Sequence, residues 1–187
     1  MIGVSADVAA WRVREGHNYP PEQFNPLWKL AYMWEHPFHF PLTAWAAVRD
    51  WGAPLWPELL GILGWQDIPL QPWTYVMLTI LLLLVPLQKM PLDFRTRGRL
   101  AAITGFAAVS YIVMVYLIFY LTYTPVASPH VLGVQGRYFI IVMPIVAIFL
   151  ASMFNVALPR GMSALISIIG SMVSGLATVS AVLQAHW

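Results

Sequence analysis

The chain of 187 residues is 59% hydrophobic and only 10% charged, and its mean hydropathy is +0.69. Soluble domains carry about a quarter charged residues, so this composition excludes an ordinary water-soluble globule and predicts an integral membrane protein. A net charge of +2 is too small to favour a nucleic-acid partner. The lack of cysteine excludes disulfides and thiolate metal sites.

Four apolar segments predict membrane spans near residues 73–88, 100–121, 138–158 and 162–184. The last three run for about twenty residues or more without an internal charge, which at about 1.5 Å per residue reaches the roughly 30 Å of a bilayer core. The first is shorter. We therefore expect an all-α membrane bundle of about four helices in residues 72–187, preceded by a leader in residues 1–71.

Basic residues gather in the link between the first two predicted spans, at Lys89, Arg95, Arg97 and Arg99. Short basic loops stay on the cytoplasmic side, so the leader and the C-terminus are expected to be extracytoplasmic, in a bacterial inner membrane. No signal peptide is found in the leader. We therefore expect the chain to be the C-terminal part of a longer or split protein, in preference to a leader that crosses the membrane alone.

The leader is rich in tryptophan and proline and is expected to be an amphipathic segment lying along the outer lipid surface. Apolar residues at helical spacing from Leu27 to Phe38 predict a helix from Pro26 that breaks at His36–Pro37. A second short helix is expected from Leu42 to Trp51. The prolines and glycines in residues 53–72 predict short helix and turn after it.

The distribution of charge directs attention to Arg137. Seven of the eight acidic residues lie in the leader, and none follows Asp93. Arg137 is nevertheless expected at the outer end of the third span, where a buried or half-buried guanidinium requires a partner. That partner is either a leader carboxylate, such as Asp67 or Glu58, or an anion outside the protein. Arginine's planar fork suits phosphate, whereas the simpler alternatives are a structural ion pair and snorkelling to lipid headgroups.

The residues next to Arg137 could complete a lipid-phosphate site. Gly136 permits close backbone approach, and Gln135 and Tyr138 add hydrogen-bond donors. No catalytic triad or phosphate loop is found, so no catalytic residue is assigned.

Metal binding is weakly indicated. His36 and His39 are close enough in sequence to share a metal with Glu35, and His130 is a further candidate ligand. Pro37 disrupts the helix that such ligation would use. We therefore expect neither a metal nor a cofactor, with His36 and His39 as weak candidates. The fourth span carries small residues that predict close packing against another helix: Ser167, Gly170, Ser171, Ser174 and Gly175.

Three blocks carry a family resemblance: residues 61–69 (GILGWQDIP), residues 123–129 (YTPVASP) and residues 134–139 (VQGRYF) followed by Pro144. Over roughly residues 20–155 the chain resembles an uncharacterised family of bacterial polytopic membrane proteins. That family is grouped with the GT-C glycosyltransferases, which take sugars from polyprenyl-phosphate carriers on the outer face of the membrane. The resemblance implies an outward-facing site at the lipid–water boundary, in which Arg137 holds a carrier phosphate.

Two functions remain open. The GT-C enzymes keep their catalytic acid in the first outer loop of a longer chain, so the resemblance implies a partner-dependent, non-catalytic C-terminal half that is not active alone. The alternative is an accessory or structural subunit of a larger membrane complex, respiratory or photosynthetic. The expected partners are membrane lipids and other polytopic membrane chains.

Overall fold

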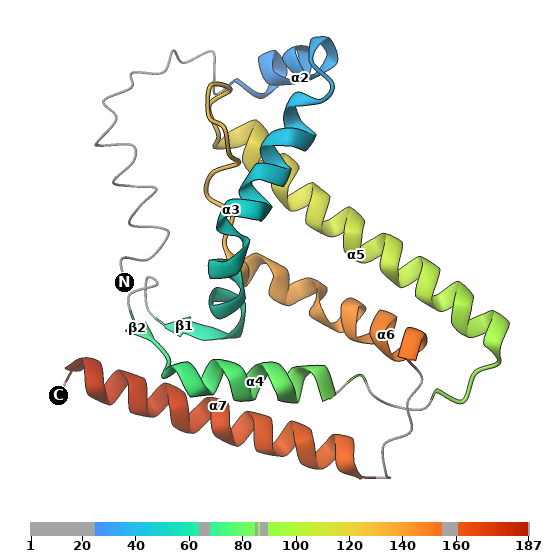
Figure 1. Cartoon of the computed structure of the whole chain (residues 1–187), viewed down its shortest axis with the longest axis vertical. Helices are drawn as coiled ribbons and strands as arrows, with labels where there is room; N and C mark the ends of the chain where they lie inside the picture. The colour runs from blue at the N-terminus through green and yellow to red at the C-terminus, as the bar shows by residue number, and fades with distance from the viewer. Residues whose placement is uncertain (1–24, 64–67, 85, 87–89, 155–160, 187) are drawn as a thin grey trace. The chain divides into compact units, whose positions relative to one another are not determined.

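The computed structural model describes residues 25–63, 68–84, 86, 90–154 and 161–186. Its helices are α2 (Pro26–Glu35), α3 (His39–Gly61), α4 (Pro72–Leu84), α5 (Phe94–Thr122), the 3₁₀ helix η2 (Gly136–Val142), α6 (Met143–Phe154) and α7 (Met162–His186) (Figure 1). Two short strands, β1 (Ile62–Leu63) and β2 (Ile68–Pro69), form an antiparallel hairpin. The helical fold predicted from composition is confirmed.

Within the described residues, three helical segments are long and apolar enough to cross a membrane: Phe94–Thr122, Gly136–Phe154 and Ala164–Gln184. They correspond to the last three predicted spans. The first predicted span is represented by α4, an apolar helix of 13 residues.

The chain divides into two compact units, which we describe separately. The first unit holds the described residues up to Leu59 together with Ile112–Tyr138, and the second holds those in Leu60–Tyr111 and Phe139–Trp187. Helix α5 therefore contributes its C-terminal part to the first unit and its N-terminal part to the second.

In the first unit, α2 begins and ends where its sequence predicts. The side chain of Asn25 caps the helix, accepting hydrogen bonds from the amides of Leu27 at 2.9 Å and Trp28 at 3.4 Å. Pro26 follows at the first helical position, where its missing N–H costs nothing. The helix ends at Glu35, and His36 caps it directly before Pro37.

The expected break after Trp51 is wrong, because α3 continues as one helix to Gly61 with Pro54 and Pro57 inside it. Each proline removes a single backbone hydrogen bond and disfavours the helix locally. Tertiary packing opposes that cost, since α3 buries Thr43, Ala47 and Glu58. Contacts with sequence-distant segments therefore override the local helix-breaking signal.

In the second unit, α4 packs against α7, and the two lie side by side (Figure 1). Leu70 ahead of α4 is buried with Ala177 and Ala181 of α7. The phenol of Tyr75 accepts a hydrogen bond from the Leu70 amide at 2.9 Å and donates one to the carbonyl of Gly61 at 3.2 Å. Tyr75 of α4 thus holds Gly61, at the start of the 61–69 block, and Leu70, directly after it.

The third span changes helix type along its length. Residues Gly136–Val142 are 3₁₀ helix, and the α-helical part begins at Met143. Pro144 is the second residue of α6, so the change of helix type falls immediately before it.

Candidate functional site

Lys29 fixes α2 to the end of α5 within the first unit. Its side chain is fully buried, and its ammonium donates to the carbonyl oxygens of Tyr120, Leu121 and Thr124 at 2.8, 3.0 and 2.5 Å. The last carbonyls of a helix lack partners within the helix and carry partial negative charge, so a cation there satisfies them. Burial lowers the pKa of Lys29 to about 8, which leaves the ammonium with its three protons at neutral pH.

The histidines considered for a metal make other contacts. His39 Nδ1 lies 2.9 Å from the hydroxyl of Tyr120, and His36 Nδ1 lies 3.3 Å from the carbonyl of Tyr32. Burial, and then the charge of His36, lower the pKa of His39. Within the described ranges, no three His, Cys, Asp or Glu side chains are placed to hold a metal ion.

The loop of residues 123–135 is tied down by hydrogen bonds within the first unit. The hydroxyl of Thr124 donates to the carbonyl of Phe119 at 3.1 Å and accepts from the amide of Leu132 at 2.9 Å. Gly133 has a φ of +83°, and a Cβ there would lie 2.9 Å from the ring of Tyr123. This position therefore requires glycine for both its backbone conformation and its packing.

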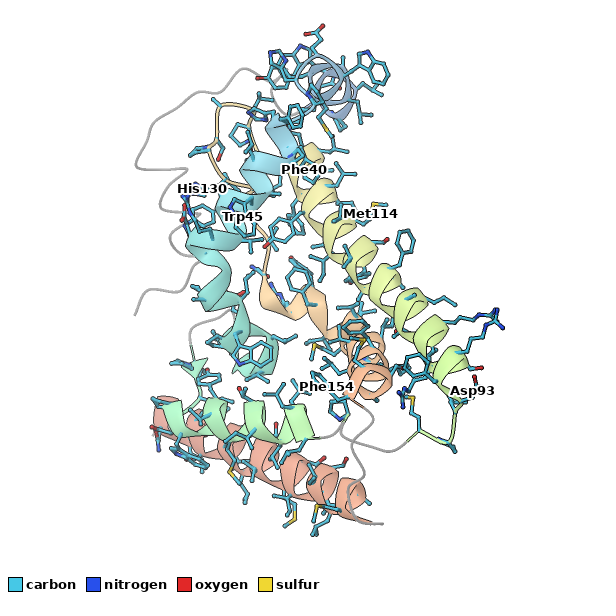
Figure 2. All side chains as sticks on the ribbon, turned by 45° about the vertical axis from the view of Figure 1, so that its right-hand side comes forward. Phe40, Trp45, Asp93, Met114, His130 and Phe154 are labelled. Atoms are coloured by element: carbon cyan, nitrogen blue, oxygen red, sulfur yellow. The ribbon has the colours of Figure 1, made fainter. Side chains whose placement is uncertain are left out.

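His130 joins the same loop to α3 (Figure 2). Its Nε2 lies 2.9 Å from the carboxylate of Asp50, and its ring stacks on Trp51 with centroids 4.6 Å apart. Asp50 also accepts two hydrogen bonds from Arg49, at 2.6 and 2.9 Å. The hydrogen bonds from Arg49 and then His130 hold the pKa of Asp50 well below its ordinary value.

Glu58 is the acidic side chain that lies beside the Gln-Gly-Arg segment. It is 7% exposed, and its Oε2 accepts a hydrogen bond from the Gly136 amide at 2.7 Å. Burial raises the pKa of Glu58, while the Gly136 hydrogen bond and the charge of Arg137 oppose that rise. The amide of Gly136 is therefore engaged by Glu58 rather than directed at an external ligand.

Arg137 is exposed, so the expectation of a buried or half-buried guanidinium is corrected. The physical reason is that its neighbour Gly136, rather than Arg137, packs against α3: a Cβ on Gly136 would meet the carbonyl oxygen of Leu55. The Arg137 guanidinium lies 5.9 Å from the centre of the Tyr138 ring. Among the described residues, no carboxylate approaches it within 4 Å.

The other residues predicted around Arg137 are distributed as follows. Gln135 is partly buried, and its Oε1 has no hydrogen-bond partner in the described part of the chain. The ring of Tyr138 packs on Phe119, with centroids 5.0 Å apart. Asp67 lies outside the described residues. The segment thus presents one exposed cation, directly after a backbone amide held by Glu58, at the start of a membrane-spanning helix.

The small residues of α7 lie on two different faces. Gly170 faces α4, where a Cβ would lie 3.6 Å from Leu81, and Ser174 is partly buried. The row of Ser167, Ser171 and Gly175 is exposed, and within the described residues nothing lies within 4 Å of a Cβ placed on Gly175.

Sequence reasoning missed Lys29 and Asp50, and it considered His130 only as an added metal ligand and not as a partner of Asp50. For Lys29 a signal was present, because it is a single cation inside the aromatic run LWKLAYMW. For the Asp50–His130 pair there was none, since the two residues are 80 positions apart.

The model of a family described as "predicted membrane protein (DUF2142)" matches residues 8–148, which are 141 of the 187 residues. The matched range includes the whole described part of the first unit and ends within α6. No curated protein and no solved structure matches the chain.

Proposed function

The chain belongs to the DUF2142 family of predicted membrane proteins, and from this membership and the site described above we propose that it binds a lipid phosphate at Arg137. In this proposal it serves as the non-catalytic, partner-dependent half of a GT-C-like glycosyltransferase that uses polyprenyl-phosphate sugars. The glycosyltransferase relationship rests on the sequence resemblance. The phosphate site rests on the exposed guanidinium of Arg137, next to the backbone amide of Gly136 that Glu58 holds.

The position of Arg137 supports this assignment. The hydrogen bond from Gly136 to Glu58 fixes the backbone next to Arg137, while the guanidinium itself stays exposed. The residue opens the apolar segment Gly136–Phe154, so its side chain belongs near the lipid–water boundary, where lipid phosphates lie. A guanidinium offers a phosphate two parallel charge-assisted hydrogen bonds.

We propose that the first unit faces the extracytoplasmic side of a bacterial inner membrane. The support is the cluster of Arg95, Arg97 and Arg99 in the first turns of α5, a helix whose C-terminal part belongs to the first unit. Basic residues beside a span favour the cytoplasmic side.

The phosphate site is tested by titrating the purified chain in detergent with a short polyprenyl phosphate and measuring the bound fraction by native mass spectrometry. A charge-assisted bond contributes about 1.5–3 kcal/mol, so Arg137→Ala should weaken binding by about tenfold or more. The affinity of Arg137→Lys should lie between those of Arg137→Ala and the unaltered chain, because lysine keeps the charge and loses the planar fork.

The matched control is Arg49→Ala, which removes another exposed arginine from the first unit, one that is paired with Asp50. It should bind like the unaltered chain. The polyprenol of equal length, without phosphate, and inorganic phosphate alone separate binding of the lipid tail from binding of the anion. Equal affinity of Arg137→Ala and the unaltered chain would exclude the phosphate site.

A second candidate, an accessory subunit of a larger membrane complex, is favoured by the exposed row of Ser167, Ser171 and Gly175 on α7. Small residues let a partner helix approach closely. Nothing described lies near a Cβ on Gly175, so Gly175→Leu should leave the fold intact and disrupt only a partner helix. Loss of a co-purifying chain in Gly175→Leu, but not in Val179→Leu, supports this candidate; no co-purifying chain in either removes it.

A further inference from the structure

Helix α2 has the reverse of the burial expected for a helix in water. Its one buried side chain is Lys29, whereas Leu27 and Trp34 are exposed by 76% and 88%. The exposed apolar surface continues past the helix to Phe38, which is 75% exposed, and to Leu42 and Trp45 on the first turns of α3. Large aromatic side chains gathered in this way mark a surface that contacts something apolar.

The contacts of Lys29 set the level of α2 along α5. Helix α5 is a membrane-spanning helix whose apolar part runs from Leu100 to Leu121, which at about 1.5 Å per residue covers roughly the 30 Å thickness of a hydrocarbon core. The carbonyls of Tyr120, Leu121 and Thr124 therefore lie where the hydrocarbon ends. Because Lys29 donates to all three, α2 is held at that same level (Figure 1).

The exposed surface of α2 is apolar, like the surface that α5 presents to lipid. Within the first unit, Met114 and Ile118 of α5 are exposed and apolar, as membrane-facing residues are. Tryptophan concentrates at the membrane interface because its ring is amphipathic. A helix with an apolar aromatic face at this level satisfies the conditions for lying in the plane of the interface.

We propose that α2 and the first turns of α3 form an interfacial anchor, whose exposed residues Leu27, Trp34, Phe38, Leu42 and Trp45 insert at the boundary between lipid headgroups and acyl chains. The occupant of this surface is the lipid of the same bilayer that α5 spans. Lys29 directs its charge inward to the end of α5, which leaves the outward face of α2 apolar. This inference concerns α2 and does not depend on phosphate binding at Arg137.

The chain contains no cysteine, so single-cysteine variants can be spin-labelled without any other change. We would label Trp34→Cys and Phe38→Cys of the whole chain in vesicles of phosphatidylethanolamine and phosphatidylglycerol. The measurement is the collision rate of each label with oxygen, which concentrates in lipid, and with a water-soluble nickel complex. Glu35→Cys, next to Trp34 but a charged position on α2, is the matched control.

At positions 34 and 38 the ratio of oxygen to nickel accessibility should exceed that at position 35 by several-fold. Labels at 34 and 38 as open to nickel as the label at 35 would place this surface in water and overturn the proposal. Labels at 34 and 38 protected from both reagents would show a protein partner in place of lipid, which also overturns it. Because positions 34 and 38 are each compared with position 35, misfolding of either test variant leaves the other comparison intact.

Discussion

At the scale of single residues, Gly136 is the position where the Gln-Gly-Arg segment touches the backbone of α3. A Cβ there would overlap the carbonyl oxygen of Leu55 and would lie 2.6 Å from the amide nitrogen of Leu59. Main-chain atoms of a helix cannot rotate away as a side chain can. We therefore expect Gly136→Ala to lower the free energy of unfolding by about 2–3 kcal/mol. The measurement is the unfolding midpoint in detergent, which should fall.

The matched control for this substitution is Gly98→Ala in α5. Nothing described lies within 4 Å of a Cβ on Gly98, and alanine favours a helix over glycine by about 1 kcal/mol. The control should therefore be neutral or slightly stabilising. If both variants unfold at the same midpoint, the close approach of Gly136 to α3 is contradicted.

Glu58 makes stability depend on pH in a defined direction. Burial raises its pKa above the ordinary 4.5, so the folded protein holds this proton more tightly than the unfolded chain. The stabilisation is complete below about pH 4.5 and is lost as the pH rises through the raised pKa. Glu58→Gln keeps an acceptor for the Gly136 amide but does not titrate. We therefore expect its stability not to fall as the pH rises through this range. Unfolding midpoints measured across that pH range test the prediction.

Asp50 should behave in the opposite sense. Hydrogen bonds from Arg49 and His130 lower its pKa below the ordinary 3.8, so its stabilisation is present above that value and is lost as the pH falls through the lowered one. We expect Asp50→Asn to lower the unfolding midpoint at neutral pH. The decrease should become smaller as the pH falls below 3.8, the ordinary pKa of an aspartate. Identical pH profiles for the Glu58 and Asp50 variants would contradict both assignments.

At the scale of elements, the end of α5 depends on a side chain that comes from α2. Lys29→Met keeps much of the side-chain volume but removes the three hydrogen bonds to Tyr120, Leu121 and Thr124. Hydrogen bonds to a charged group contribute about 1.5–3 kcal/mol, so we expect a loss of about that size. Amide hydrogen exchange should rise at α2 and at residues 123–135 while the N-terminal half of α5 stays protected.

The elements also mark how far the sequence can predict this fold. Local signals located α2, because Asn25, Pro26 and Pro37 act on neighbouring residues. They failed at α3, because Pro54 and Pro57 oppose a helix that is packed against a segment close to Gly136, far along the chain. The Gln-Gly-Arg segment was found as a pattern. Its contact with Glu58 was not, since 78 positions separate Glu58 from Gly136.

At the scale of the whole molecule, the proposed orientation has a direct test. Ala127 and Leu92 are exposed, and they lie in the links after and before α5. If the first unit is extracytoplasmic, a membrane-impermeant thiol reagent should label Ala127→Cys in intact cells and Leu92→Cys only after lysis. The reverse pattern would invert the orientation. Labelling of both in intact cells would mean that α5 does not separate the two sides.

The 3₁₀ start of the third span affects how well that helix fits the thickness of the bilayer. Its 7 residues rise about 2.0 Å each and extend about 14 Å, where an α-helix would extend about 10 Å. Together with the 12 residues of α6 the path reaches about 32 Å, whereas 19 residues of α-helix reach about 28 Å. The same 19 residues can therefore match a thicker or a thinner hydrocarbon core, depending on whether η2 is 3₁₀ helix or α-helix. A thinner bilayer would favour the shorter form, in which η2 is α-helix.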